Sequence, residues 1–593
     1  MAVVVDVLTT DCILRPMRPL FQFAPWMVSA CAGLGQGDAF GPLQLEDATA
    51  SEGGAAVEPD TGGSDTGDGP EVPAEECVRY IAPPSGPSGL TSESFSVRAV
   101  EDGVERSTCL VIEDLDGDGW PDIFTTGRMH AEKGAAYGIH VLWGGEGGPV
   151  EQRWVVPDRM DTCTATDLDG DGDFDILGGH IEGLWALDNL GDRSWAVRKK
   201  VVPLDDGAQW FLDSVARFDI DGVPPLDLMV GTSGHLTEEC ISASDDPGET
   251  DVRVFGEMIS GRVQCFVGEE GGGFSPAPDG LCPDSLAEMQ ATNPYTFNLA
   301  DFDDDNRADL FLGNDFSENY FLRSVPGGGL LDATAESGLG AYDHAMGAVV
   351  ADLDGDGLRD IYVSDVGPDG LFIADGCTSW YDAAFVRGVA EGTDRTVTWG
   401  TAGHDFDLDG DIDLMVAFSL EVGDGGFAAP LCAFDSLGLP DSPTILLVND
   451  GGGHFERVDL PPPEGGGLSD WYYVRLATSD LDRDGDVDVV TLSEARGMRI
   501  HTNETPAGGG WLSIRPLQDG FPVIGARVIV HQGDGERMQD LYGTHGSGGH
   551  SELRAHFGLG AEAGPVDVSV RWPDGVVSLW EGVAINQVLD LER

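Results

Sequence analysis

The sequence predicts an all-β chain in which a seven-bladed β-propeller is followed by a small β-rich C-terminal domain. Three observations support this fold class. An aspartate-rich string recurs at a spacing of about 52 residues, short β-favouring stretches flank every copy, and 85 glycines among 593 residues follow no regular period. A unit of this length with four short strands has the size of a propeller blade, and abundant glycine is typical of tight turns.

The repeated string is D-x-D-x-D-G-x-x-D, followed directly by apolar residues. Neighbouring copies are 51 to 53 residues apart, except for two intervals of 82 and 75 residues that indicate insertions within 231–292 and 418–444. Seven copies predict seven blades that close into a ring. Six intact copies begin at Asp114, Asp167, Asp301, Asp352, Asp405 and Asp480, and a degenerate copy begins at Asp219.

Each unit is expected to supply four strands. Leu110–Ile112 leads into the first loop and Ile123–Phe124 leaves it, while Ile445–Val448 and Phe455–Val458 supply the third and fourth strands of the sixth unit. The last unit lacks a fourth strand of its own. We expect the alternating stretch Ser94–Val100, which precedes the first unit, to pair with the last blade and remove two exposed sheet edges.

The N-terminal region predicts export. Within residues 1–31, Arg15 and Arg18 precede a short apolar stretch, and the tetrapeptide VSAC that ends at Cys31 resembles a bacterial lipobox. We expect lipidation at Cys31, with a plain signal peptide as the alternative, and therefore a cell-surface lipoprotein or a secreted protein. No later run approaches the ~18 apolar residues of a membrane span. Residues 32–93 are acidic and poor in large apolar side chains, which predicts a disordered tether.

Charge and cysteine content narrow the function classes. The 105 acidic residues outnumber 32 basic ones, which gives a formal net charge of -73. The negative electrostatic field of this charge repels phosphate backbones, so we expect no nucleic-acid partner. The repulsion among the acidic residues also calls for bound cations. Eight cysteines besides Cys12 and Cys31 allow up to four disulfides in an exported protein, with the pairing left open. The propeller is assigned to residues 94–505 and the C-terminal domain to residues 506–593.

The aspartate-rich loops are predicted calcium sites. Calcium takes six to eight oxygen ligands, and carboxylates at alternating positions of a tight loop can converge on one point, together with the backbone carbonyl at the seventh position. Gly119 stands where the first loop must turn sharply, and Asn306 takes this place in the Asp301 loop. The predicted ligands are Asp114, Asp116, Asp118, Trp120, Asp122, Asp167, Asp169, Asp171, Asp173, Asp175, Asp301, Asp303, Asp305, Arg307, Asp309, Asp352, Asp354, Asp356, Leu358, Asp360, Asp405, Asp407, Asp409, Asp411, Asp413, Asp480, Asp482, Asp484, Asp486 and Asp488.

Other interpretations of these loops fit less well. The spacing matches the first half of an EF-hand loop, but no glutamate stands at the twelfth position and the flanks are strands. Magnesium demands a tighter octahedron and keeps its waters. Solvated acidic turns that bind nothing would hold four carboxylates together at a cost of several kcal/mol in mutual repulsion. The sequence therefore predicts about six calcium ions.

The third repeat is expected to be the exception. It keeps the span from Asp219 to Asp227, but Val223 replaces the third carboxylate and Pro224 stands where glycine allows the turn. Proline cannot adopt the left-handed conformation. We expect no tight site here, with Val223 and Pro225 packed where the ion would otherwise lie.

The motifs resemble two known families. The loops and their flanks, over about residues 95–505, resemble the FG-GAP/VCBS repeats of integrin α-subunit propellers and bacterial surface proteins. The last 80 residues resemble the ASPIC/UnbV domain that follows such repeats in cartilage-acidic-protein-like chains, although the Gly- and His-rich stretch Thr544–Gly549 departs from that pattern. This second resemblance is carried by Trp511-Leu512, Ile524–Val528, His556–Gly560 and Val570–Gly575.

No catalytic constellation stands out, so we expect a binding module and not an enzyme. HExxH, GxSxG and P-loop motifs are missing from the sequence, and His545, Ser547 and His550 are interpreted as polar residues of a flexible glycine turn. The resemblance to integrin-type repeats implies adhesion-like binding to a surface protein or carbohydrate. Two alternatives remain, a polysaccharide-acting enzyme with its site in the propeller channel and a purely structural envelope spacer.

Overall fold

The computed structural model describes residues 78–593 apart from internal gaps, of which the longest are 234–260, 422–443 and 461–472. The expected export segment with Cys31, and residues 32–77 of the expected tether, lie outside the described residues. Within the described part, strands dominate and the helices are single turns, which confirms the all-β prediction; none of them is long and apolar enough to cross a membrane. These helices are α4 (Asp284–Ala287), α5 (Thr334–Ser337) and α6 (Val389–Thr393).

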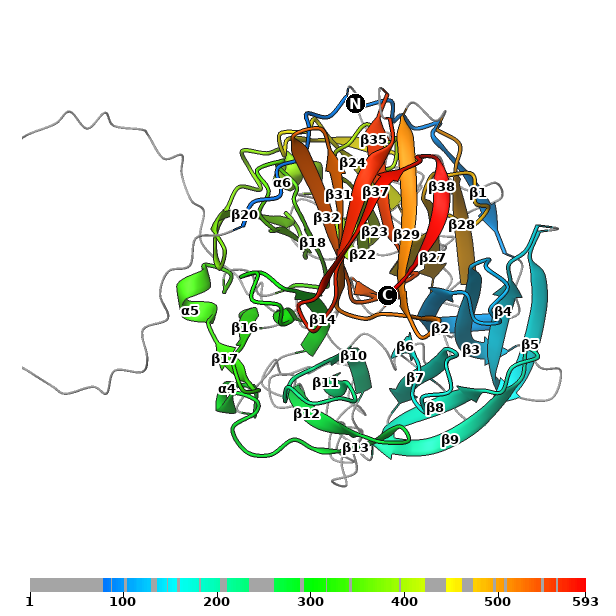
Figure 1. Cartoon of the computed structure of the whole chain (residues 1–593). Coiled ribbons are helices and arrows are strands. Elements are labelled where there is room, and N and C mark those ends of the chain that lie inside the picture. The colour runs from blue at the N-terminus through cyan, green and yellow to red at the C-terminus, as the bar shows by residue number, and fades with distance from the viewer. Residues whose placement is uncertain are drawn as a thin grey trace, which may run out of the picture.

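Seven sets of four antiparallel strands form the repeat region among the described residues (Figure 1). Each set winds outward from its first strand, as the repeat pattern predicts. The first three sets are β2 (Val104–Glu113), β3 (Asp122–Met129), β4 (Ala136–Trp143) and β5 (Val150–Val156); β6 (Thr162–Thr166), β7 (Asp175–His180), β8 (Gly183–Asn189) and β9 (Trp195–Val202); and β10 (Phe211–Phe218), β11 (Asp227–Ser233), β12 (Arg262–Glu269) and β13 (Gly273–Pro276).

The remaining four sets follow the same plan. They are β14 (Asn293–Ala300), β15 (Asp309–Asp315), β16 (Tyr320–Ser324) and β17 (Leu330–Asp332); β18 (Gly347–Ala351), β19 (Asp360–Ser364), β20 (Gly370–Gly376) and β21 (Ser379–Asp382); β22 (Thr396–His404), β23 (Asp413–Glu421), β24 (Thr444–Asn449) and β25 (Phe455–Asp459); and β26 (Tyr473–Ser479), β27 (Asp488–Ser493) and β28 (Gly497–Asn503) with β1 (Phe95–Ala99).

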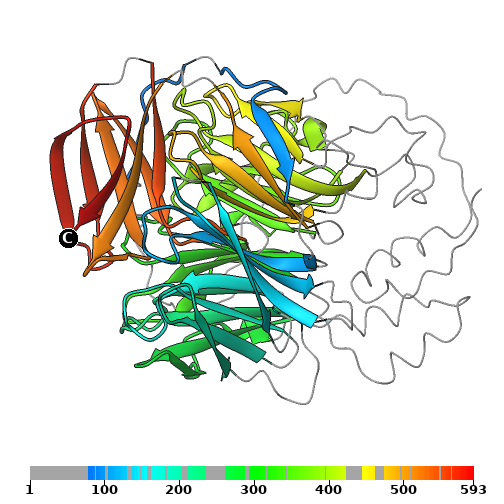
Figure 2. The ribbon, with the colours of Figure 1, turned by 90° about the vertical axis from the view of Figure 1, so that its right-hand side faces the viewer.

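The first strands of the sheets surround a common axis. Each of β2, β6, β10, β14, β18, β22 and β26 contacts the next, and β26 contacts β2. The ring is closed through β1, which pairs antiparallel with β28 from Phe95 opposite Asn503 to Ala99 opposite Arg499 (Figure 2). The predicted pairing of Ser94–Val100 with the last blade is therefore confirmed, and the edge of that blade is covered.

Apolar side chains fill the spaces between neighbouring blades. Phe311 and Phe321 are fully buried between the fourth and fifth blades, where Phe321 and Trp380 pack edge to face with ring centroids 5.0 Å apart. A disulfide between Cys109 and Cys163 joins β2 to β6, the inner strands of the first two blades. A second disulfide and a further bonded cysteine are also described, at Cys265–Cys282 and Cys377, whereas Cys77, Cys240 and Cys432 lie outside the described residues.

The C-terminal domain consists of two small sheets that pack on each other and against the propeller (Figures 1 and 2). Its core centres on Trp572, which is completely buried, and is continuous with the core between the first two blades. The first sheet contains β29 (Gly510–Gln518), β30 (Phe521–Pro522), β35 (Ala555–Gly560) and β38 (Gln587–Glu592), and the second contains β31 (Ala526–Gln532), β32 (Gly535–Leu541), β36 (Val566–Arg571) and β37 (Val577–Val583).

The Gly- and His-rich segment of this domain reaches the propeller axis. It forms β33 (Thr544–His545) and β34 (Gly549–His550), and β34 pairs in parallel with the inner strand β2, with His550 opposite Val111. His550 is 1% exposed, and its ring nitrogens lie 3.0 Å from the Thr164 hydroxyl and 3.2 Å from the Glu113 carboxylate. The interpretation of this segment as a flexible glycine turn is therefore wrong for His550, which is fixed by its partners in two blades.

Residues 78–93 follow the propeller surface and do not hang free of it. The backbone N–H of Tyr80 donates to Gly357 at 3.1 Å, that of Gly86 donates to Asp409 at 2.8 Å, and the Ile81 carbonyl accepts from Glu536 of the C-terminal domain. This segment, which we call the strap, was expected to belong to the disordered tether. Its backbone hydrogen bonds give it a fixed path between the aspartate-rich loops and the C-terminal domain.

Candidate metal centre

Every aspartate-rich loop joins the first strand of a blade to the second. In the first loop, between β2 and β3, one oxygen from each of Asp114, Asp116 and Asp122 lies within 4.8 Å of the others. The loops that begin at Asp167, Asp219, Asp301 and Asp352 gather three carboxylates in the same way. The structure thus brings together the side chains that the alternating spacing predicts. These groups are Asp167, Asp169 and Asp175; Asp219, Asp221 and Asp227; Asp301, Asp303 and Asp305; and Asp352, Asp354 and Asp356.

Backbone N–H groups shape the loops around the carboxylates. The first aspartate of each intact loop accepts the N–H of the sixth residue, as Asp114 Oδ2 accepts from Gly119 at 3.1 Å. This sixth residue has a positive φ, 91° at Gly119 and 70° at Asn306, which confirms the predicted need for glycine or asparagine. The equivalent bonds in the other loops join Gly172 to Asp167, Asn306 to Asp301, Gly357 to Asp352, Gly410 to Asp405 and Gly485 to Asp480.

The seventh residue is held by the fifth. The N–H of Trp120 donates to Asp118 Oδ1 at 3.0 Å, and the N–H of Leu358 donates to Asp356 Oδ1 at 2.9 Å. The same bond fixes the backbone of the other seventh residues, whose carbonyl groups remain predicted ligands. Those residues are Asp173, Arg307, Asp411 and Asp486.

The ninth aspartate also belongs to the framework of the blade. Asp122 accepts the N–H of Leu115 at 2.9 Å through Oδ2 and the N–H of Gly144, at the end of the third strand, at 2.7 Å through Oδ1. It therefore ties its loop to the next strand with or without a metal ion. The same pair of bonds recurs at Asp175, Asp227, Asp309, Asp360 and Asp488.

The loop carboxylates are buried and short of hydrogen bonds. Burial raises the pKa of Asp122 to about 8, and burial together with repulsion from Asp409 raises the pKa of Asp411 to about 8. At the loops, buried carboxylate oxygens have no hydrogen-bond partner in the described structure. They include Asp114 Oδ1, Asp173 Oδ1, Asp301 Oδ1, Asp407 Oδ1, Asp409 Oδ2, Asp413 Oδ2 and Asp486 Oδ1. Such atoms are costly unless a proton or a cation satisfies them, so the donor set fits a hard divalent cation.

The third repeat differs from its expectation in one respect. Val223 is 60% exposed, so the prediction that it packs where an ion would lie is wrong. Its N–H donates to Asp221 Oδ1 at 2.8 Å, and the carboxylates of Asp219, Asp221 and Asp227 still gather. The absence of a tight site in this loop stays a prediction, which depends on the missing third carboxylate and on Pro224 at the turn position.

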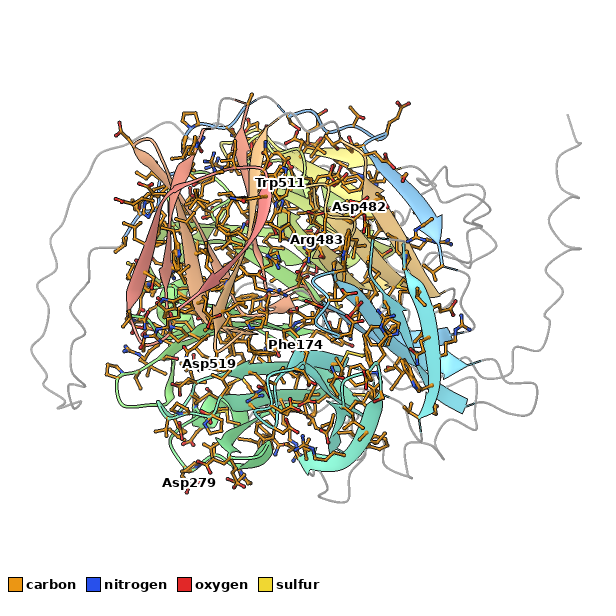
Figure 3. All side chains as sticks on the ribbon, turned by 45° about the vertical axis from the view of Figure 1, so that its right-hand side comes forward. Phe174, Asp279, Asp482, Arg483, Trp511 and Asp519 are labelled. Carbon is orange, nitrogen blue, oxygen red and sulfur yellow. A yellow bond between two sulfur atoms is a disulfide. The ribbon has the colours of Figure 1, made fainter. Side chains whose placement is uncertain are left out.

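The C-terminal domain lies directly on the loops, which the spacing of the repeats did not predict. Trp511 packs against Gly485 of the seventh loop, close to Asp482 and Arg483 (Figure 3). Phe521 packs against Phe174 of the second loop, with ring centroids 4.6 Å apart and the rings tilted by 55°. Trp511 lies more than 20 residues after the last loop, and Phe521 lies more than 300 residues after Phe174. Sequence spacing therefore carries no signal for these neighbours.

Three arginines of that domain reach loop carboxylates. Arg515 lies 3.4 Å from Asp114, and Arg571 lies 2.9 Å from Asp301. Arg527 is 2% exposed and contacts Asp301 at 3.4 Å. The domain therefore places arginines on carboxylates at two of the predicted sites, and at a third site Arg537 donates to the Gly410 carbonyl at 3.4 Å.

With this geometry established, comparison with known proteins defines the class. The model for the FG-GAP-like repeat matches residues 114–178 and 301–363, and the model for ASPIC and UnbV matches residues 518–593. The chain therefore carries FG-GAP-like repeats in its propeller and an ASPIC and UnbV domain at residues 518–593, which confirms both resemblances over the matched residues.

Particular relatives can also be identified. The chain is 27% identical to cartilage acidic protein 1 of Xenopus tropicalis over 297 residues, which cover 48% of this chain and 42% of that protein. It is 27% identical to the Mus musculus protein of the same name over 278 residues, covering 45% and 40%. The match thus spans less than half the length of these relatives. A solved Agrocybe aegerita lectin that recognises non-reducing terminal N-acetylglucosamine is 17% identical, with 67% of this chain and 94% of that chain covered, and its TM-score of 0.37 is too low to carry an argument.

Proposed function

We propose that this protein is a calcium-binding, non-catalytic binding module of the cell exterior, in which about six calcium ions stiffen the loop face of the propeller. The observation that carries the proposal is the recurrence of buried carboxylate oxygens without hydrogen-bond partners at corresponding loops. Calcium accepts an irregular set of six to eight oxygens, and each loop offers several carboxylates and a backbone carbonyl. An ion in each loop would also offset part of the net charge of -73.

The proposed partner is a surface protein or a carbohydrate, bound in the manner of an adhesion module. The FG-GAP-like repeats and the similarity to cartilage acidic protein 1 support this class of function. Because the C-terminal domain and the strap lie on the loop face, the partner is proposed to bind another surface of the propeller. Lipid at Cys31, if the export segment is processed as its sequence predicts, would hold the module at the membrane.

An enzyme with its site in the channel receives less support. In the described part of the chain, β34 lies along β2 at the loop-face mouth of the channel, and His550 there is fully engaged. A spacer without a partner would be distinguished by pull-down from surface extracts. A binding module is expected to retain a specific ligand in calcium and to lose it in chelator, whereas a spacer retains none under either condition.

The metal proposal is tested by thermal unfolding of the full chain in millimolar calcium, in excess chelator, and in chelator with magnesium. An ion that binds only the folded state contributes about 2.7 kcal/mol per site at a hundredfold excess over its Kd. Calcium is expected to raise the unfolding midpoint strongly and magnesium weakly. Equal midpoints in calcium and in chelator would refute the proposal.

A further inference from the structure

Three of the loops begin with the same hexapeptide, DLDGDG, yet their first aspartates are bonded differently. In the Asp167 loop, Oδ1 accepts the N–H of Gly170 at 2.7 Å and Oδ2 accepts that of Gly172 at 3.2 Å. The Asp352 loop repeats this arrangement, with distances of 2.9 and 3.1 Å. Both oxygens of these first aspartates are therefore engaged by the loop itself.

Asp114 has the same sequence around it but only one engaged oxygen. Its Oδ2 accepts the N–H of Gly119 at 3.1 Å and lies 3.4 Å from Arg515 Nη1 of the C-terminal domain. Its Oδ1 is buried and has no hydrogen-bond partner, and Asp114 as a whole is only 9% exposed. Because the six loop residues are identical, we attribute the difference to the surroundings of the loop, where Arg515 of the docked domain contacts Asp114.

Asp301 shows the same arrangement in a loop of different sequence. Its Oδ2 accepts the N–H of Asn306 at 3.1 Å and the guanidinium of Arg571 at 2.9 Å, and Arg527 lies 3.4 Å from the same oxygen. Its Oδ1 is again buried and without a partner, and the residue is 5% exposed. In both loops the C-terminal domain contacts Oδ2 of the first aspartate and leaves Oδ1 without a hydrogen-bond partner.

We propose that the C-terminal domain completes two of the metal sites, with Arg515 and Arg571 acting as positioning residues that fix Asp114 and Asp301 in the ion-binding orientation. The proposal rests on the proposed calcium function and divides the sites into two classes. At Asp114 and Asp301 the free oxygen is held ready by the domain. At Asp167 and Asp352 each oxygen of the first aspartate already accepts an N–H, so an ion there has to share its oxygen with a hydrogen bond.

The charge of the arginines does not cancel this benefit, because each is balanced by a carboxylate outside the ligand set. Arg515 pairs with Asp590 through two bonds, Nε to Oδ1 at 3.1 Å and Nη2 to Oδ2 at 2.9 Å. Arg571 also donates to Asp304 at 2.5 Å. What the arginines supply is orientation, and loss of such an outer partner typically weakens metal binding about 10- to 100-fold.

The test compares R515Q and R571Q in the full chain with R457Q, which removes the same charge from the outer strand β25, where Arg457 pairs with Asp459. Calcium binding is measured by calorimetric titration and by native mass spectrometry at limiting calcium. We expect each of the two test variants to weaken one site by at least about tenfold and to leave the others unchanged, and R457Q to leave all sites unchanged.

Double variants assign each effect to its loop. With the first site removed by D116A, adding R515Q should change nothing further, and D303A should likewise mask R571Q. If R515Q lowers the folded fraction, D590N replaces it as the test variant. D590N removes the half-exposed carboxylate that holds Arg515, and Asp590 contacts no aspartate-rich loop. Unchanged or tighter binding in R515Q and R571Q would overturn the inference while leaving the calcium function intact. A parent chain that binds no calcium would instead refute the proposed function.

Discussion

Replacement of Asp360 by asparagine is expected to destabilise the propeller even when no metal is bound. Asp360 is fully buried, and its Oδ2 accepts the N–H of Leu353 at 2.9 Å and that of Asp354 at 3.2 Å, while Oδ1 accepts that of Ala374 at 2.8 Å. Burial raises the pKa of Asp360 well above its usual range, but even a protonated carboxyl keeps acceptor lone pairs on both oxygens. An amide nitrogen has none.

The size of the effect follows from that geometry. In D360N the amide nitrogen must face at least one backbone N–H, which leaves a buried donor unpaired at a cost of about 2 kcal/mol. D354N is the matched control, because Asp354 accepts the N–H of Asp356 through Oδ1 alone and an asparagine keeps that oxygen. Its other oxygen pairs with Arg387 at 3.2 Å between side chains that are 12% and 19% exposed, and Arg387 keeps its hydrogen bond to the Gly452 carbonyl when this pair is lost.

Denaturant unfolding in excess chelator, followed by tryptophan fluorescence, separates the role of Asp360 as a hydrogen-bond acceptor from its role as a metal ligand. D360N is expected to lower the unfolding midpoint clearly and D354N only slightly, whereas both should weaken the response to calcium. D227N extends the test to the third repeat, where Asp227 accepts the N–H groups of Ile220 and Gly268 at 2.8 and 2.9 Å. Equal midpoints for D360N and D354N in chelator would show that the ninth aspartate serves the ion alone, and the reasoning from hydrogen bonds would fail.

Three further outcomes are expected. Native mass spectrometry should count six tightly bound calcium ions, five after D116A and still six after D221A; seven equivalent tight sites would contradict the interpretation of the third repeat. E552A should cost about 3–5 kcal/mol, because it removes the carboxylate shared by two buried arginines at the domain interface, and faster hydrogen exchange in 510–560 would report the loosened domain. In the metal-free protein, the raised pKa values of about 8 at Asp122 and Asp488 favour the protonated folded state. Stability should therefore fall as pH rises from about 4 to 8, a trend that saturating calcium should abolish, and a metal-free midpoint that rises over this range would refute the assignment.

Local features of the chain were predictable because their causes are local. Strand β24 lies where the apolar run Ile445–Val448 precedes a glycine turn. Asn306 takes a positive φ because the sixth loop residue must turn sharply in every intact repeat. The convergence of carboxylates in each loop follows from the same short-range geometry. These features need only a few neighbouring residues, and repetition along the chain makes them recognisable.

Contacts between distant segments were decided by the tertiary structure alone. Nothing in the Gly- and His-rich segment has the periodicity of a strand, yet β34 pairs in parallel with β2, with Gly549 opposite Leu110. The strap has the composition of a tether, and its order comes from hydrogen bonds to loops over 200 residues away. The clearest case is DLDGDG, where the same six residues at Asp114 and Asp167 carry different hydrogen bonds and only Asp114 meets Arg515. Local sequence sets which oxygens a loop can offer, and packing against the second domain decides which side chains from outside the loop reach them.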